Sequence, residues 1–241
     1  MDLRHRDQLG HAGTFAGAIA SGLKNMLTRC WAVLFLGLSV SSAAAQEKPL
    51  PKVVLIGDSI RIGYAPLVAK RLAGRAIIVS AEPNGEDSGN VLKHLDEWAI
   101  KERPDVVHIN AGLHDLKLTG TRYQVPLVEY EKNLKTILER IRSGTKAKII
   151  FATSTPILDG LHAQRKAGFD RFEADVQKYN NAAVAVMNQA GVPINDLHRL
   201  VEDGGKEHLM LGDGTHYTQT GYEILAAAVT DSILRALAER P

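Results

Sequence analysis

Cysteine is almost absent from this sequence. Among its 241 residues the one cysteine is Cys30, which lies in an apolar stretch near the N-terminus. A single cysteine excludes an internal disulfide framework and a cysteine-rich metal site. A thiol nucleophile is therefore not expected in the rest of the chain.

Long apolar runs are also scarce. The clearest is WAVLFLGLSV, at residues 31–40, which follows the basic residues Lys24 and Arg29 and precedes the small residues SSAAAQE. A membrane-spanning helix needs roughly 20 apolar residues, so we expect no stable membrane insertion. The order of basic, apolar and small residues is typical of a secretory signal, which predicts a secreted or periplasmic protein.

The predicted signal has an A-x-A cleavage site at Ala43 and Ala45, so the mature chain would begin at Gln46. Because residues 1–25 make an unusually long lead, we interpret Met26 as the true start of translation. A structural helix over residues 14–28 is the alternative. We therefore expect a signal-bearing extension over residues 1–45 and a single domain over residues 46–241.

Neither sign of charge dominates. The chain has 29 basic and 27 acidic residues, and the first 45 residues contain four of the basic and two of the acidic ones. The remainder has a net charge of about zero and no basic stripe. This balance argues against nucleic acid as a partner.

Several motifs of known sites are missing. The sequence has no G-x-S-x-G, which argues against the nucleophile elbow of α/β-hydrolases. It has no G-x-x-x-x-G-K-[ST] and no G-x-G-x-x-G, so we expect no nucleotide cofactor, nor any other cofactor. A metal site is conceivable, but there is no H-E-x-x-H and no ligand spacing that demands an ion. Its ligands would be His108, His114, Asp115, Asp213 and His216.

From residue 52 onward, short apolar runs alternate with longer amphipathic stretches. Unbroken runs rich in β-branched residues predict strands that are covered on both faces. The runs lie at 53–56, 76–79, 106–109, 149–152 and 192–194, and the helical patterns lie at 62–73, 89–101, 127–142, 170–190 and 220–238. This alternation predicts a three-layer α/β/α fold with a five-stranded parallel sheet.

Ligands of such sheets bind beyond the carboxyl ends of the strands, so the residues after each run are candidates for a site. Ser59 follows the first run, in the sequence Gly57-Asp58-Ser59. A serine at this place is either the cap of the next helix or a nucleophile. The local sequence does not decide between the two.

Asp213 and His216 lie in a glycine-rich turn before the last helical pattern, in LGDGTHYTQTGY. A serine hydroxyl attacks only if a base takes its proton, and an imidazole serves when a carboxylate orients it. A D-x-x-H turn can supply both groups from one loop. A solvated turn with an incidental histidine is the alternative.

The motif Gly57-Asp58-Ser59 after the first strand and the D-x-x-H turn before the last helix resemble the motifs of the SGNH hydrolases, also called the GDSL esterase family. The resemblance covers nearly the whole chain after the predicted signal and implies a flavodoxin-like SGNH hydrolase fold. It places the nucleophile at Ser59 and its catalytic partners at Asp213 and His216. The glycine of the second family motif matches Gly85 in AEPNGEDSGN, with Gly89 as the alternative.

The third family motif departs from the pattern. The family has G-x-N-D, whereas this chain has Gly112-Leu113-His114-Asp115. The family's asparagine donates an N–H to the oxyanion, and an imidazole can carry a donor at similar reach. We therefore expect an oxyanion hole made by the backbone N–H groups of Ser59 and Gly85 and by the side chain of His114.

Other polar residues near these turns have less definite roles. Asp58 is interpreted as a loop hydrogen-bonding residue, and His198 is expected at the surface of a short helix after the fifth strand. A predicted long loop, residues 159–169, carries a further group that either contacts substrate or is simply solvated. This group consists of His162, Arg165 and Lys166.

The resemblance implies a serine esterase that works through an acyl-enzyme on Ser59. It is closer to small acetyl esterases of carbohydrates than to long-chain lipases, and the 5% aromatic content and the lack of an apolar lid agree with this. We expect short acyl groups, chiefly acetyl, on carbohydrate. A broad short-chain carboxylesterase or lysophospholipase is the alternative within the same chemistry. A non-catalytic module that binds a sugar or an anion is the alternative of another class.

Overall fold

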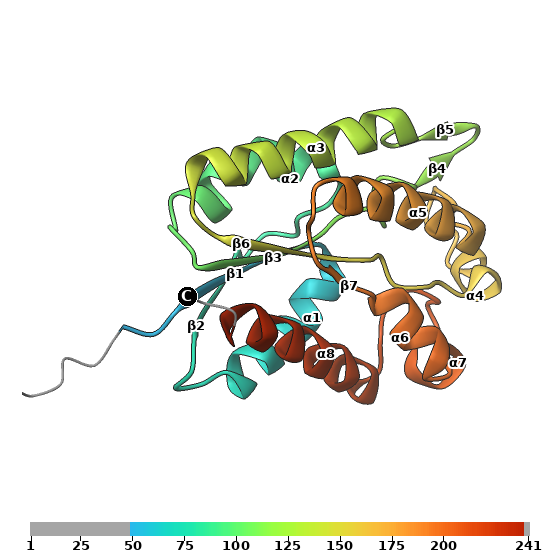
Figure 1. Cartoon of the computed structure of the whole chain (residues 1–241). Coiled ribbons are helices and arrows are strands. Elements are labelled where there is room, and N and C mark those ends of the chain that lie inside the picture. The colour runs from blue at the N-terminus through green and yellow to red at the C-terminus, as the bar shows by residue number, and fades with distance from the viewer. Residues whose placement is uncertain (1–48, 239–241) are drawn as a thin grey trace, which may run out of the picture. The chain divides into compact units, whose positions relative to one another are not determined.

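The computed structural model describes residues 49–238, in which five parallel strands form a sheet between two layers of helices (Figure 1). The strands are paired in the order β2-β1-β3-β6-β7. They comprise β1 (Lys52–Ile56), β2 (Ile77–Ser80), β3 (Val106–Asn110), β6 (Lys148–Ala152) and β7 (Ile194–Asn195). The predicted α/β fold with a five-stranded parallel sheet is confirmed, and the strand order is that of flavodoxin-like sheets.

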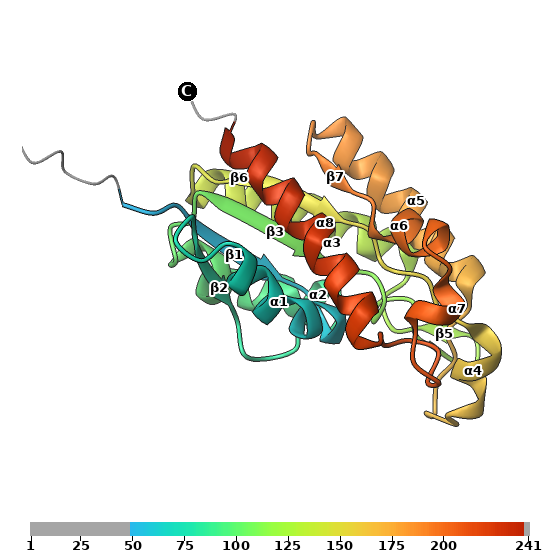
Figure 2. The same cartoon turned by 90° about the horizontal axis from the view of Figure 1, so that it is seen from below.

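The helices form two groups, one on each face of the sheet. One face is covered by α2 (Ser88–Leu95), α3 (Leu127–Gly144) and α5 (Glu173–Gln189), and the other by α1 (Ser59–Arg71) and α8 (Gln219–Ala238). Seen from below, α1 and α8 cross in front of the strands (Figure 2). Because both faces are covered, the strands are buried as the unbroken apolar runs require.

The long helix α3 shows how the sequence specifies this arrangement. Its buried residues recur every three or four positions, which places them on one stripe facing the sheet. They are Tyr130, Asn133, Leu134, Ile137, Leu138 and Ile141. In β1, by contrast, Val53 to Ile56 are all at most 2% exposed, since the strand is covered from both sides.

Several elements differ from the expectations. The fifth strand is β7, a two-residue strand that begins at Ile194, and the second helical pattern ends as a π-helical turn, η1 (Asp96–Ile100). The predicted loop at 159–169 contains the helix α4 (Asp159–Gln164). A hairpin of β4 (Leu118–Thr119) and β5 (Arg122–Tyr123) was not predicted, because two-residue strands are too short to show alternation.

Two further short helices follow the sheet's last strand. They are α6 (Leu197–Asp203), which agrees with the short helix expected around His198, and α7 (Lys206–Leu209). No helix between residues 49 and 238 is long and apolar enough to cross a membrane. The predicted signal, the cleavage site at Ala45 and the start at Met26 lie outside the described residues and stay predictions.

Candidate active site

Ser59 is the first residue of α1, directly beyond the carboxyl end of β1. The cap of this helix is Asp58, whose carboxylate accepts the N–H of Ile60 at 2.9 Å. The alternative of a capping role for Ser59 is therefore wrong, and Asp58 is the hydrogen-bonding residue of the turn. Burial raises the pKa of Asp58, against the opposing effects of the Ile60 N–H and of nearby positive charge from Arg171.

Ser59, His216 and Asp213 form a hydrogen-bonded row. The Nδ1 atom of His216 lies 2.6 Å from Oδ2 of Asp213, and its Nε2 atom lies 2.9 Å from Oγ of Ser59. Since a carboxylate only accepts, Nδ1 carries the proton and Nε2 is left to accept from the serine hydroxyl. This arrangement can draw a proton from Ser59.

The turn at 213–216 holds its own carboxylate in place. Oδ1 of Asp213 accepts the backbone N–H groups of Thr215 at 2.9 Å and His216 at 2.8 Å. Partial burial works to raise the pKa of Asp213, but these N–H groups and the His216 ring outweigh it and lower the pKa to about 2. Asp213 is therefore ionised at neutral pH and can stabilise an imidazolium.

Gly85 packs directly against the turn that carries Ser59. Its N–H donates to the carbonyl oxygen of Gly57 at 2.9 Å, and a Cβ at Gly85 would lie 2.6 Å from the same oxygen. Only glycine permits this approach. Gly89 instead lies inside α2, where a Cβ would meet the side chain of Asp87 at 3.2 Å. The structure thus places Gly85 beside Ser59, with its N–H engaged by a backbone acceptor.

His114 follows β3 and is partly buried. Its Nδ1 atom is buried without a hydrogen-bond partner among residues 49–238. Burial, and then the charges of Lys117 and Arg171, lower the pKa of His114 to about 3, so the ring is neutral and carries one N–H. The charge of His216 acts in the same direction, with a smaller effect.

Asp115, the next residue, joins the loop after β3 to α2. Its carboxylate accepts the backbone N–H of Ser88 at 2.9 Å and also the Ser88 hydroxyl. Burial raises the pKa of Asp115 to about 7, against the lowering effect of these two hydrogen bonds. Asp115 thus has a structural part in holding the loop that presents His114.

Two buried arginines were missed by the sequence analysis. Arg61 donates to the carbonyls of Gly57, Ala81 and Pro83 and so fastens the Ser59 turn to the loop after β2. Arg171 is 4% exposed and donates from Nε to the carbonyl of Leu113 at 2.7 Å. Most arginines are exposed, and a single sequence does not show which of them the fold will bury.

The expectations for the remaining histidines and cations are corrected in part. His162 is buried on α4, 2% exposed, with Nδ1 3.3 Å from the hydroxyl of Thr215, so it supports the 213–216 turn rather than lying in a solvated loop. Arg165 and Lys166 are both exposed, and Nη1 of Arg165 lies 3.9 Å from Oδ2 of Asp213. His198 is partly buried, with a side chain that is 16% exposed and Nε2 2.6 Å from Glu173.

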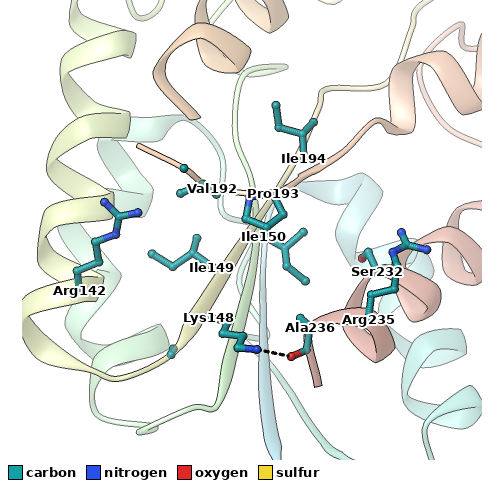
Figure 3. A pocket seen from close by; sticks show the side chains of 12 residues that line it. Arg142, Lys148, Ile149, Ile150, Val192, Pro193, Ile194, Ser232, Arg235 and Ala236 are labelled. Carbon is teal, nitrogen blue, oxygen red and sulfur yellow. Dashed lines mark hydrogen bonds between the residues drawn. The ribbon is translucent and has the colours of Figure 1, made fainter. Parts of the chain in front are cut away.

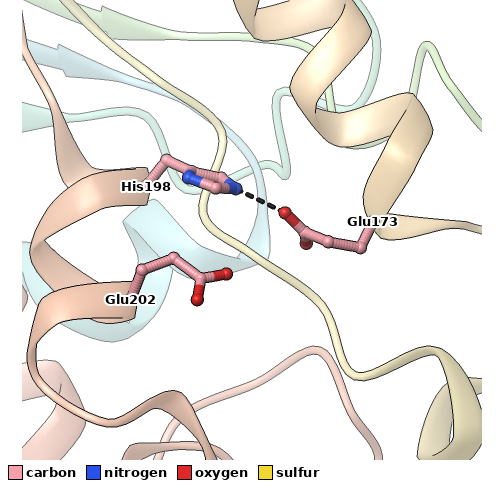
Figure 4. Close-up of side chains that lie close together, drawn as sticks. All are labelled: Glu173, His198 and Glu202. Atoms are coloured by element: carbon pink, nitrogen blue, oxygen red, sulfur yellow. Dashed lines mark hydrogen bonds and ion pairs between the residues drawn. The ribbon is translucent and has the colours of Figure 1, made fainter.

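Among the described residues, the side chains considered above as ligands of a metal ion do not form a cluster of ligand atoms. His108 is fully buried within the sheet, where it accepts a hydrogen bond from Asn195. Glu173, His198 and Glu202 do gather, with ligand atoms within 4.8 Å of one another (Figure 4). The Glu173 oxygens already accept from the Ile157 N–H and from His198, so this group joins α5 to α6.

A cavity of about 360 Å³ lies at the other end of the sheet (Figure 3). It opens near the amino ends of β6 and β7, between α3 and the last turns of α8. Its walls include Ile149, Ile150, Val192, Pro193 and Ile194, with Arg142 and Arg235 also lining it. It is separate from the Ser59 turn, which lies at the carboxyl ends of the strands.

A flavodoxin-like sheet with a hydroxyl, an imidazole and a carboxylate in a row at its carboxyl edge is the arrangement of a serine-type hydrolase. The chain belongs to the GDSL-like lipase/acylhydrolase family, whose sequence pattern matches residues 55–224. It is an ester hydrolase, and the predicted resemblance to the SGNH hydrolases is confirmed. The alternative of a non-catalytic binding module is therefore set aside.

Known proteins of the family are similar to the chain along most of its length. The isoamyl acetate-hydrolyzing esterase 1 homolog of Mus musculus is 27% identical over 209 residues, which cover 78% of this chain and 84% of that protein. The lipase/acylhydrolase from Enterococcus faecalis superposes with a TM-score of 0.67 and 26% identity, over 76% of this chain and 95% of that one. An acetyl xylan esterase shares the fold, with a TM-score of 0.63 and 18% identity over 76% and 99% of the two chains.

Proposed function

We propose that this ester hydrolase works through an acyl-enzyme on Ser59. The observation that carries the proposal is the row in which Ser59, His216 and Asp213 are joined at 2.9 and 2.6 Å. Oγ of Ser59 attacks the ester carbonyl while Nε2 of His216 takes its proton. The imidazolium, held by Asp213, then protonates the leaving alcohol. Water attacks the acyl-enzyme with His216 again as base, which releases the acid and restores Ser59.

Three donors are proposed for the oxyanion of the tetrahedral intermediate. The Ser59 N–H lies at the N-terminus of α1, where it has no intrahelical acceptor. The Gly85 N–H lies beside the Ser59 turn, and the substrate oxygen would share or replace its contact with the Gly57 carbonyl. The neutral ring of His114 supplies the third N–H in place of the family's asparagine.

For the substrate, we propose acetyl groups on carbohydrate. Two of the similar proteins are named for acetyl esters, one of isoamyl alcohol and one of xylan, so acetyl is the acyl group that their names share. A short-chain ester of a simple alcohol is the second candidate, favoured by the similarity to the isoamyl acetate-hydrolyzing proteins. These two candidates differ in the alcohol alone.

The catalytic proposal is tested with purified protein, p-nitrophenyl acetate and the variant Ser59→Ala. We expect kcat to fall at least about 10³-fold, because a triad that loses its nucleophile keeps only the rate provided by binding and the oxyanion hole. Ser143→Ala is the matched control, since Ser143 is an exposed serine on α3. Equal rates for the wild type and Ser59→Ala would exclude Ser59 as nucleophile. Acetate release from acetylated xylo-oligosaccharides and from isoamyl acetate then decides between the alcohols.

A further inference from the structure

Arg171 is a largely buried cation, 4% exposed, that forms no ion pair within residues 49–238. It lies in the segment that joins α4 to α5, and its Nε donates to the Leu113 carbonyl. Within residues 49–238, its two Nη atoms have no hydrogen-bond partner, and they are not fully enclosed, so they remain accessible to a ligand. Asp58 and Asp213 act on the Arg171 charge only from further away. A charge with most of its surface buried is stabilised by a contacting anion, and residues 49–238 supply none to the Nη atoms of this guanidinium.

Further positive charge lies next to Arg171. The Phe169 ring has the guanidinium carbon of Arg171 at 5.0 Å and the Nζ atom of Lys117 at 4.9 Å from its centroid. A further cation, Arg165, lies at the 213–216 turn, with Nη1 3.9 Å from Oδ2 of Asp213. Two cations thus lie over one aromatic ring and a third lies at the 213–216 turn, in a protein with nearly equal numbers of acidic and basic residues.

This cationic group belongs to the reaction centre rather than to a distant surface. Arg171 holds the carbonyl of Leu113, the residue before His114. The charges of Arg171 and Lys117 both act on the His114 ring, and that of Arg171 acts on Asp58, the neighbour of Ser59. A group bound at the Nη atoms of Arg171 would therefore lie near the loop that carries His114, a proposed donor for the ester held at Ser59.

We propose that the substrate carries a compact oxyanion, a carboxylate or a phosphate, which binds the Nη atoms of Arg171, with Lys117 and Arg165 at the edge of the same site. A guanidinium offers two parallel N–H donors to such a group. The proposal rests on the proposed function, because the reacting ester is placed at Ser59. If the substrate is an acetylated carbohydrate, this anion site would favour acetylated acidic sugars over neutral ones.

The test compares three phenyl acetates that differ in one substituent. These are 4-acetoxybenzoate, 4-acetoxyphenyl phosphate and the neutral methyl 4-acetoxybenzoate, with each kcat/KM divided by the rate of spontaneous hydrolysis. We expect at least one charged ester to exceed the neutral one by about tenfold or more at low ionic strength, and added salt to reduce that preference. The charged ester that is preferred identifies the anion. Equal values for all three esters would overturn the proposal.

Variants then test the residues. Arg171→Gln should bring the preference to about one, because the loss of the guanidinium charge falls on the charged esters alone. The neutral ester should also slow, but less than the charged ones, since the Nε hydrogen bond to the Leu113 carbonyl is lost as well. An equal loss for charged and neutral esters would show a structural role and overturn the assignment. If Arg171→Gln does not fold, Lys117→Gln decides: it must lower the preference, whereas Lys132→Gln, on the exposed side of α3, must not.

A binding measurement separates this inference from the proposed function. The thermal unfolding of Ser59→Ala is followed with each ester present, because a ligand that binds the folded state raises Tm without turnover. A larger shift with the preferred charged ester than with the neutral one supports the anion site even if Ser59 is not the nucleophile. Equal shifts would contradict the anion site even in an active esterase.

Discussion

At the scale of single residues, the carbonyl oxygen of Gly57 is the point where the candidate site is held together. It accepts the Gly85 N–H at 2.9 Å and the Nη2 and Nε atoms of Arg61 at 3.1 and 3.3 Å. The nucleophile turn and the proposed oxyanion loop therefore meet through one backbone oxygen. Small displacements here change where a substrate carbonyl can sit relative to Ser59.

Gly85→Ala is expected to lower kcat by about 10²-fold, the scale of losing one oxyanion donor. A Cβ would lie 2.6 Å from the Gly57 oxygen, so the loop must move away from the Ser59 turn. The measurement is kcat with p-nitrophenyl acetate, alongside circular dichroism for folding. Gly160→Ala is the control, because that glycine on α4 has open space around its Cβ position. An unchanged kcat in Gly85→Ala would remove Gly85 from the proposed oxyanion hole.

His114→Ala should lower kcat by about 10²–10³-fold, whereas His114→Asn should retain most of the activity, because an amide also offers an N–H donor. Since the pKa of His114 is lowered to about 3, its ring is neutral above about pH 4. The shape of the kcat profile between pH 5 and 9 should therefore be the same in both variants as in the wild type. A His114→Ala protein with wild-type kcat would contradict the donor role.

At the scale of elements, the packing of α1 against α8 sets the relation between nucleophile and base. α1 begins at Ser59, and α8 begins three residues after His216. The two helices meet at Gly63, where a Cβ would lie 2.1 Å from the ring of Tyr222. The missing side chain of Gly63 thus lets α8 approach α1 closely enough for His216 to reach Ser59.

Gly63→Ala is expected to reduce the free energy of unfolding by about 1–3 kcal/mol, the usual cost of overpacking. The reduction should be smaller in a Tyr222→Ala background, since the ring that the new methyl group meets is then absent. Urea unfolding of the wild type, Gly63→Ala, Tyr222→Ala and the double variant measures the coupling free energy between the two positions. Strictly additive effects would mean that the two helices do not meet at this pair.

The elements that the sequence predicted correctly are those with long or unbroken patterns. The apolar runs at 53–56 and 106–109 were recognisable because a strand buried on both faces is apolar at every position. The stripe of α3 was recognisable because a helix buried on one face has apolar residues every three or four positions. The strand β7 begins later than predicted and the helix α4 was missed, since elements of two to six residues are too short to show a period. At the site, Ser59 and the 213–216 turn were found through motifs. Arg171 was not, because only the fold reveals that it is buried.

At the scale of the whole molecule, a buried histidine in the sheet makes stability depend on pH. Burial lowers the pKa of His108 to about 4, against an ordinary value of about 6.5. Between these values the unfolded chain binds a proton that the folded chain does not, so stability falls as pH falls. This contribution is complete above about pH 6.5 and lost progressively down to about pH 4.

The expected result for His108→Gln is a weaker acid destabilisation than in the wild type. From pH 7 to pH 4, the free energy of unfolding of the wild type should fall by up to about 3 kcal/mol relative to the variant, the linkage limit for this shift. Denaturant unfolding at pH 4, 5, 6 and 7 measures the difference. His208→Gln, at an exposed histidine on α7, is the control. If the difference in unfolding free energy between the wild type and His108→Gln is constant from pH 4 to pH 7, His108 has the same pKa in the folded and the unfolded protein.

Ser59 and His216 are 157 residues apart in the chain, yet their side chains are joined by one hydrogen bond. No fragment of the sheet contains both, and neither α1 nor α8 alone can assemble the pair. During refolding, helical signal can return early through local contacts, whereas contacts between distant residues form slowly. Recovered hydrolysis in this protein would therefore report when the two ends of the domain have come together, which the helical signal does not.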